Sequence, residues 1–154
     1  MSLRRAARRW AARRMDRVIA VSEDVKRYVT EDLGARPDRV AVIDAIISPA
    51  VRPRGARPFR DVPQLIMVAR LETQKGHDTV LRALAQVPPP WELTIIGVGS
   101  LERELKELAE RSGIASRVRF IGETDDVPRY LRDADLFLFP SRWEGMGAAV
   151  LEAM

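Results

Sequence analysis

The sequence contains no cysteine and a single histidine, His77, among its 154 residues. Disulfide bonds and thiolate metal sites are therefore excluded, and a reducing compartment is compatible with the composition. No segment approaches the roughly 20 consecutive apolar residues that a membrane-spanning helix needs. The N-terminal region also lacks the apolar core of a signal peptide. We therefore expect a cytoplasmic protein.

Positive charge is concentrated in the first part of the chain. Residues 1–60 contain 15 Lys and Arg against 7 Asp and Glu, whereas residues 61–154 contain 11 against 15. The net charge of +4 therefore comes entirely from the first part.

The densest basic segment places Leu3, Ala7, Trp10 and Ala11 at helical spacing among arginines, which predicts a basic amphipathic helix. We favour a helix that packs its apolar stripe on its own domain. The alternative is peripheral contact with the inner face of an anionic membrane. We expect no nucleic-acid partner, because no base-reading motif or aromatic interleaving accompanies the arginines.

The rest of the sequence alternates apolar runs with amphipathic helical segments. The predicted strands cover residues 16–22, 39–47, 64–70, 91–97, 117–122 and 135–141. The predicted helices cover residues 23–33, 76–87, 100–113, 127–134 and 147–154. This alternation indicates an α/β fold, a Rossmann-like parallel sheet with helices on both faces. A segment rich in proline, residues 49–63, predicts a linker between residues 1–48 and 64–154.

The residues that are hardest to explain by packing follow the predicted strands: Arg70, Lys75, Gly97, Gly99, Gly122, Ser141, Glu144, Gly145 and Gly147. In an open parallel sheet, ligands bind beyond the carboxyl ends of the strands. Two cations and backbone amides near a helix start favour a phosphate, whereas carboxylates at the same edge favour hydroxyl groups. A nucleotide sugar combines these chemical groups, so we predict that class of ligand.

Four segments follow one another in the sequence: VARLETQKGHDTVLRAL, LTIIGVGS, RVRFIGETDDVPRYLRDADLFLFPS and EGMGAAVLEAM. Together they closely resemble the donor-binding half of retaining GT-B glycosyltransferases, in the bacterial group that carries a Glu-x7-Glu motif (glycosyl transferases group 1, family 4). The motif residues are Glu144 and Glu152. The segment DRVIAVSEDVKRYV is similar to the last strand–helix unit of the family's N-terminal domain. The resemblance implies an incomplete GT-B fold, in which residues 1–48 are the tail of the acceptor-side domain and residues 64–154 a donor domain truncated at its C-terminus.

The resemblance also implies a role for each matching residue. Arg70 and Lys75 bind the diphosphate of the donor and stabilise it as the leaving group without a metal. Glu144 holds hydroxyl groups of the transferred sugar, and Glu152 accepts hydrogen bonds from the ribose. Backbone contacts are implied for two further sets: Gly145, Met146 and Gly147 toward the sugar or its phosphate, and Arg119, Phe120 and Ile121 toward the base.

The implied reaction transfers a hexosyl group from a UDP-sugar or GDP-sugar with retention, and needs no cofactor. Because most of the acceptor domain is missing, we expect weak donor binding and no turnover by this chain alone. One alternative is a non-catalytic remnant that binds a membrane or a partner through the basic helix. Another is a dinucleotide-binding domain, but the third glycine of its fingerprint falls on Glu102.

Three further features have plainer interpretations. Asp125 and Asp126 precede a predicted helix and are interpreted as charges that favour its start, not as metal ligands. His77 has no candidate co-ligands at metal-binding spacing and is interpreted as structural or solvent-facing. The strand at residues 135–141 is expected at an exposed sheet edge, where self-association is favoured.

Overall fold

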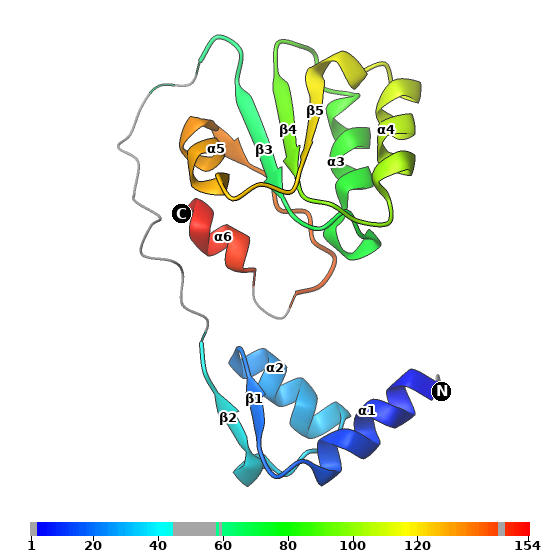
Figure 1. Ribbon diagram of the computed structural model, residues 1–154, viewed down its shortest axis with the longest axis vertical. Coiled ribbons are helices and arrows are strands. Elements are labelled where there is room, and N and C mark those ends of the chain that lie inside the picture. Colours follow the sequence, from blue (N-terminus) through cyan, green and yellow to red (C-terminus); the bar gives the residue numbers. More distant parts are fainter. Residues whose placement is uncertain (1–2, 45–57, 59, 145–146) are drawn as a thin grey trace. The chain divides into compact units, whose positions relative to one another are not determined.

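The computed structural model describes residues 3–44, 58, 60–144 and 147–154. The chain divides into two compact units, one formed by residues 3–44 and the other mainly by residues 60–144 and 149–154 (Figure 1). Most of the predicted linker lies outside the described residues. In the described part of the chain, no helix is long and apolar enough to cross a membrane.

The first unit combines two helices with two short parallel strands. Its elements are α1 (Leu3–Arg14), β1 (Val18–Ala20), α2 (Glu23–Arg27) and β2 (Val40–Val42). The side chain of Ser22 caps α2 by accepting a hydrogen bond from the backbone N–H of Val25 at 3.2 Å. The predicted helix over residues 23–33 is only partly α-helical, because it continues as a π-helical turn over Tyr28–Asp32. Helix α1 and the two strands form where predicted. The predicted packing of the apolar stripe of α1 on its own domain is wrong within this unit, because Leu3 is 90% exposed and Trp10 61%, and the buried residue of the helix is Ala12.

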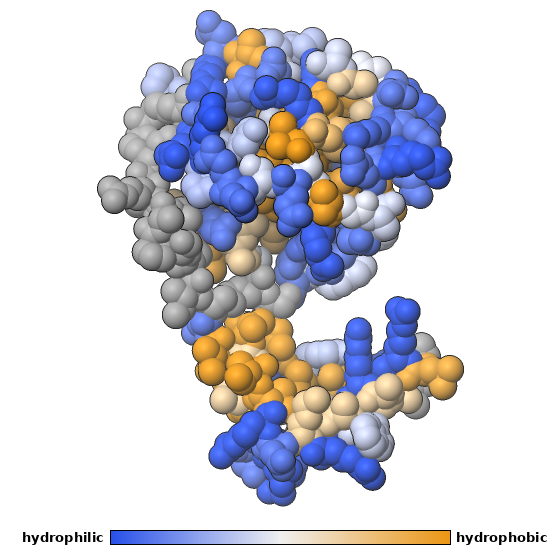
Figure 2. Space-filling view, in the orientation of Figure 1, coloured by the Kyte–Doolittle hydropathy of each residue, from blue (hydrophilic) through white to orange (hydrophobic). Residues whose placement is uncertain are grey.

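The small sheet of the first unit carries exposed apolar side chains. Ile19 is 64% exposed, Ile43 55% and Val21 38%. Figure 2 shows apolar surface gathered over β1 and β2. Parallel strands are normally covered on both faces, and within the first unit only one face has a core, formed by Ala12, Ala20, Leu33, Ala35 and Val40.

The second unit contains a four-stranded parallel sheet in the order β5-β4-β3-β6. Its strands are β3 (Gln64–Val68), β4 (Glu92–Ile96), β5 (Val118–Gly122) and β6 (Leu136–Phe137). Its helices are α3 (His77–Leu84), α4 (Glu102–Arg111), α5 (Val127–Asp133) and α6 (Ala148–Ala153). The predicted order of elements and the parallel sheet are confirmed. β6 is shorter than predicted and lies at an edge of the sheet, as expected.

Side chains that alternate along the strands of the second unit point to the two faces of its sheet. Leu65 and Met67 of β3, with Leu93 and Ile95 of β4, belong to the main core. Helices α3 and α4 cover this face, and they lie side by side in Figure 1. Their contributions to the core are Val80, Leu81, Leu84, Leu105, Leu108 and Ala109. The intervening strand residues therefore face the layer that contains α5.

Gly97 lets the turn after β4 lie directly against the chain that follows β3. Its φ angle is +134°, and a Cβ atom there would overlap the carbonyl oxygen of Ala69. Gly113 has a φ angle of +69°, but a Cβ atom at that position would meet no atom within 4 Å. A side chain at Gly113 would therefore introduce backbone strain alone, whereas one at Gly97 would introduce both strain and a steric clash.

We predict that Gly97→Ala lowers the free energy of unfolding by about 3 kcal/mol, because strain and overlap add. Gly113→Ala, which introduces only the strain, should cost about 1 kcal/mol. Urea unfolding of both variants measures the difference. Equal losses would mean that the close approach at Gly97 contributes nothing.

Candidate functional site at the carboxyl edge of the sheet

The chain that leaves β3 is bound to the turn that leaves β4. The N–H of Leu71 donates to the carbonyl of Val98 at 3.0 Å, and the N–H of Leu101 donates to the carbonyl of Leu71 at 3.0 Å. The carboxylate of Glu72 accepts from the Ser100 hydroxyl at 3.1 Å and from the Ser100 N–H at 3.3 Å. The two loops therefore form one layer beyond the strand ends.

The same β3 loop is bound on its other side to residues that follow β6. The N–H of Arg142 donates to the carbonyl of Gln74 at 2.8 Å, and the Gln74 side chain donates to the carbonyl of Trp143 at 2.6 Å. The guanidinium of Arg142 donates to both carboxylate oxygens of Asp78 at 2.9 Å and also to the carbonyl of Thr73. Three segments far apart in sequence thus meet at one edge of the sheet.

Gly76 makes the closest part of this contact possible. A single 3-10 turn, Thr73–Lys75, ends at Gly76, whose φ angle is +70°. A Cβ atom at this position would overlap the carbonyl oxygen of Pro140. Only glycine fits this approach without displacing the backbone.

Lys75 and Glu144 form an ion pair at the centre of this edge. Their Nζ and Oε1 atoms lie 2.5 Å apart, and their side chains are only 15% and 20% exposed. The Nζ atom also lies 5.9 Å from the centre of the Phe139 ring, within the range of a cation–π contact. The ammonium and the carboxylate are therefore both largely withdrawn from water.

Burial raises the pKa of the Glu144 carboxyl group, but the groups around it more than offset this effect and hold the pKa below the ordinary value of 4.5. These groups are, in order, the hydrogen bond from Lys75, the nearby Ser141 hydroxyl and the charges of Lys75 and Arg70. Ser141 Oγ forms no well-aligned hydrogen bond with any described residue, so we take Lys75 as the principal partner.

Arg70 differs from Lys75 in its surroundings. Its side chain is exposed, and it forms no hydrogen bond or ion pair within the described ranges. Its charge nevertheless acts on Glu144. Three of the predicted site residues thus lie on loops at the same edge of the sheet: Lys75 and Glu144 are in direct contact, and Arg70 follows β3.

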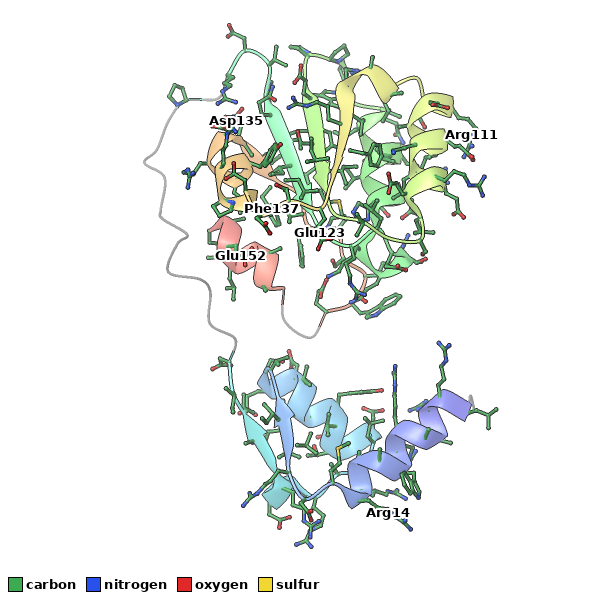
Figure 3. All side chains as sticks on the ribbon, viewed as in Figure 1. Arg14, Arg111, Glu123, Asp135, Phe137 and Glu152 are labelled. Atoms are coloured by element: carbon green, nitrogen blue, oxygen red, sulfur yellow. The ribbon has the colours of Figure 1, made fainter. Side chains whose placement is uncertain are left out.

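Of the other predicted site residues near the C-terminus, Glu152 and Gly147 lie within the described part of the chain. Glu152 is partly buried on α6 (Figure 3) and makes no hydrogen bond or ion pair with a described residue. Gly147 is described and precedes α6, whereas Gly145 and Met146 lie outside the described residues. The predicted roles of these four residues stay predictions.

Arg119 and Phe120 lie on β5 and face opposite sides of the sheet. Arg119 donates from Nη2 to the Thr94 hydroxyl at 3.2 Å, and Phe120 packs against the core with the Lys106 ammonium 5.7 Å from its ring centre. Arg119 also lines a pocket of about 400 Å³ beside α5, together with Arg60, Gln64, Leu65, Ile66, Thr94, Arg129, Tyr130, Asp133 and Ala134. The predicted contact between the backbone of residues 119–121 and a base stays a prediction.

Comparisons with known sequences place the chain in a family. The profile described as "Glycosyl transferases group 1" matches residues 54–154, which is more than half of the chain. The chain belongs to the glycosyl transferases group 1 family. A second profile, described as "Glycosyltransferase Family 4", matches residues 1–51.

Curated relatives of this group 1 chain are longer proteins. The lipopolysaccharide core biosynthesis mannosyltransferase LpsB of Rhizobium meliloti is 39% identical over 93 residues, which cover 55% of this chain and 26% of LpsB. The glycogen synthase of Mycobacterium tuberculosis is 33% identical over 154 residues, which cover 96% of this chain and 37% of the synthase. The chain therefore spans well under half the length of these relatives.

Solved structures of glycosyltransferases share the fold. Anabaena Alr3699/HepE, solved in complex with UDP and glucose, is 25% identical with a TM-score of 0.78, and the similarity covers 97% of this chain and 44% of HepE. The lipopolysaccharide outer core galactosyltransferase WaaB, in its apo form, is 25% identical with a TM-score of 0.69, covering 90% of this chain and 40% of WaaB. The predicted α/β fold of GT-B glycosyltransferases is therefore confirmed.

Sequence reasoning missed the bonds that hold the site loops of this group 1 chain together. Arg142 and Asp78 are 64 residues apart, and nothing in a single sequence pairs them. Asp126 lies immediately before α5, as interpreted, although its side chain does not cap the helix. Within residues 3–44, 60–144 and 147–154, no group of three potential ligands could hold a metal ion.

His77 is buried rather than solvent-facing. It is 1% exposed, and neither ring nitrogen has a hydrogen-bond partner among the residues that the structure describes. Burial lowers its pKa from 6.5 to about 4; Asp78 opposes this shift, and the charge of Lys75 adds to it. The structural interpretation of this residue is therefore confirmed.

We predict that the protein loses stability as pH falls from about 7.5 to about 5. The unfolded chain binds a proton on His77 near pH 6.5 while the folded chain does not, so about 2 kcal/mol of unfolding free energy is lost. His77 is the sole histidine, and Glu144 loses its stabilising charge only at lower pH. Urea unfolding at the two pH values checks the slope, which His77→Phe should largely abolish. An unchanged slope in that variant would contradict the assignment.

Proposed function

We propose that the second unit binds a nucleoside diphosphate sugar and forms the donor side of a retaining hexosyltransferase that needs no metal. The observation that carries this proposal is the meeting of Arg70, Lys75 and Glu144 at the carboxyl edge of the sheet. That edge is where open parallel sheets bind ligands. Two cations suit a diphosphate, and a carboxylate suits the hydroxyl groups of a sugar.

Each residue acts on a different part of the donor. Arg70 and Lys75 bind the diphosphate and stabilise the negative charge that develops as the glycosidic bond breaks. Glu144 accepts hydrogen bonds from sugar hydroxyls, and Glu152 from the ribose. The backbone of residues 145–147 contacts the sugar or its phosphate, and that of residues 119–121 contacts the base. HepE has been solved with UDP-glucose as well as with UDP and glucose, which supports a donor of this class.

The matched relatives are two to four times as long as the region they share with this chain, and the described residues of the first unit form two parallel strands. We propose that the donor-side groups named above bind the donor weakly and do not by themselves complete the transfer. A purely non-catalytic role is not favoured, because LpsB is a mannosyltransferase by name and the matching family is one of glycosyl transferases.

We predict that UDP or GDP binds the chain and that Arg70→Ala and Lys75→Ala each weaken binding about 10-fold or more. Each substitution removes a charge-assisted hydrogen bond to phosphate, which contributes about 1.5–3 kcal/mol. Calorimetric titration measures the change. Arg111→Ala is the matched control, since Arg111 lies at the end of α4 (Figure 3) and its ion pair with a described residue is to Glu107 at 3.6 Å. Equal affinity in the original protein and all three variants would contradict the proposed binding of the diphosphate by Arg70 and Lys75.

The exposed face of α1 supports peripheral contact with an anionic membrane surface. Leu3 is 90% exposed and Trp10 61%, whereas Ala12, on the opposite side of the helix, is buried. The helix carries six arginines and no acidic residue. Arg4, Arg8 and Arg9 have no ion-pair partner in the described part of the chain. Apolar side chains among unpaired cations are typical of helices that lie on anionic lipid.

We predict that the chain sediments with vesicles that contain phosphatidylglycerol and not with neutral phosphatidylcholine vesicles. Replacing both Leu3 and Trp10 by serine should reduce the bound fraction several-fold, because apolar burial at the interface is lost. Val87→Ser, at a site that is 46% exposed in the second unit, is the control. Equal sedimentation with both kinds of vesicle would contradict this contact.

A further inference from the structure

Two of the charged groups that the proposed site offers to the donor, Lys75 and Glu144, are bound to each other. Lys75 Nζ lies 2.5 Å from Glu144 Oε1, and both side chains are at least four-fifths buried. Yet the proposed function assigns them to different parts of the donor, the diphosphate and the sugar. Without a donor, Glu144 therefore holds the ammonium group that the diphosphate would bind, and Lys75 holds the carboxylate that the sugar hydroxyls would bind.

The loops that carry this pair are fixed by bonds that do not involve it. Arg142 joins the β6 side to Thr73, Gln74 and Asp78, and Gly76 lies against Pro140. A change of partner at Lys75 therefore requires rotation of its side chain and no movement of a loop. The flexible four-carbon stem of lysine allows such a rotation.

Arg70 provides a starting point for the exchange. It is exposed and has no hydrogen bond with a described residue, so a diphosphate reaches it without breaking a hydrogen bond to that part of the chain. A phosphate held at Arg70 adds negative charge beside Glu144, which weakens the hold of that carboxylate on Lys75.

We infer that the Lys75–Glu144 ion pair is a closed resting form of the site, and that a nucleoside diphosphate takes Lys75 from Glu144 and so frees this carboxylate for the sugar hydroxyls. The inference rests on the proposed function. In this exchange Glu144 competes with UDP for Lys75, but it also binds the sugar of UDP-glucose. One substitution should therefore have opposite effects on the two ligands.

The decisive variant is Glu144→Gln, which keeps the shape of the side chain and removes the competing charge. We expect it to bind UDP about tenfold more tightly than the original protein, because Lys75 no longer has to leave a charged partner. We also expect that this variant no longer binds UDP-glucose more tightly than UDP. Calorimetric titrations with UDP, UDP-glucose, GDP and GDP-mannose measure both effects.

Two controls distinguish exchange from other causes. Glu123→Gln removes a carboxylate directly after β5 at the same edge of the sheet (Figure 3) and should leave UDP affinity unchanged. In a Lys75→Ala background, Glu144→Gln should no longer tighten UDP binding. If the tightening persists there, plain repulsion between the carboxylate and the diphosphate explains it, and the exchange is wrong.

The outcomes separate this inference from the proposed function. If the original protein binds UDP and Glu144→Gln binds it equally or more weakly, the exchange is overturned while donor binding stands. If only Glu144→Gln binds UDP, the resting pair blocks the site and the exchange is supported. If neither binds any of the four nucleotides, both ideas fail. Thermal melting of each variant, with Glu144→Ala as a second substitution, verifies that the proteins tested are folded.

Discussion

The arrangement of the second unit depends on one contact, the docking of the chain after β3 between the chains that leave β4 and β6. On one side, Gly97 permits the close approach of the backbone at Ala69. On the other side, Gly76 lies against Pro140 and Arg142 bridges to Asp78. Since backbone groups and a half-buried guanidinium fix these segments, the positions of the side chains they carry follow. Lys75 and Glu144, 69 residues apart, meet for this reason.

Much of this fold could be predicted from the sequence, because apolar periodicity reports which segments bury a face. The alternation of strands and helices predicted a parallel sheet, and the carboxyl ends of parallel strands must share an edge. That geometry alone brings Arg70 and Glu144 to the same side of the sheet. It does not determine that Lys75 bonds to Glu144, since the bond depends on the 3-10 turn at Thr73–Lys75.

Features that depend on tertiary contacts could not be predicted. The Arg142–Asp78 pair joins two residues that look like ordinary surface charges. His77 has a polar side chain, yet the helix start carries it into the interior without a hydrogen bond to any described residue. The paired length of β6, Leu136 and Phe137, is shorter than the apolar run over residues 135–141 indicates. By contrast, the side of the sheet that Arg119 faces follows from the strand pattern, because its neighbours Val118 and Phe120 both point toward the core.

The unequal surroundings of the two cations explain why both are useful at one site. Arg70 is exposed and has no hydrogen bond or ion pair with a described residue, so in the proposed site it attracts a diphosphate without giving up a contact with that part of the chain. An enclosed lysine already has its charge balanced, so the same ligand gains from it only by displacing Glu144. Arg70, Lys75 and Glu144 together carry a net charge of +1, which is too little to neutralise a diphosphate while the carboxylate stays paired. In the proposed site, binding of a diphosphate therefore favours an arrangement in which Glu144 turns to neutral hydroxyl groups, and the proposed recognition of the phosphates and of the sugar is coupled in this way.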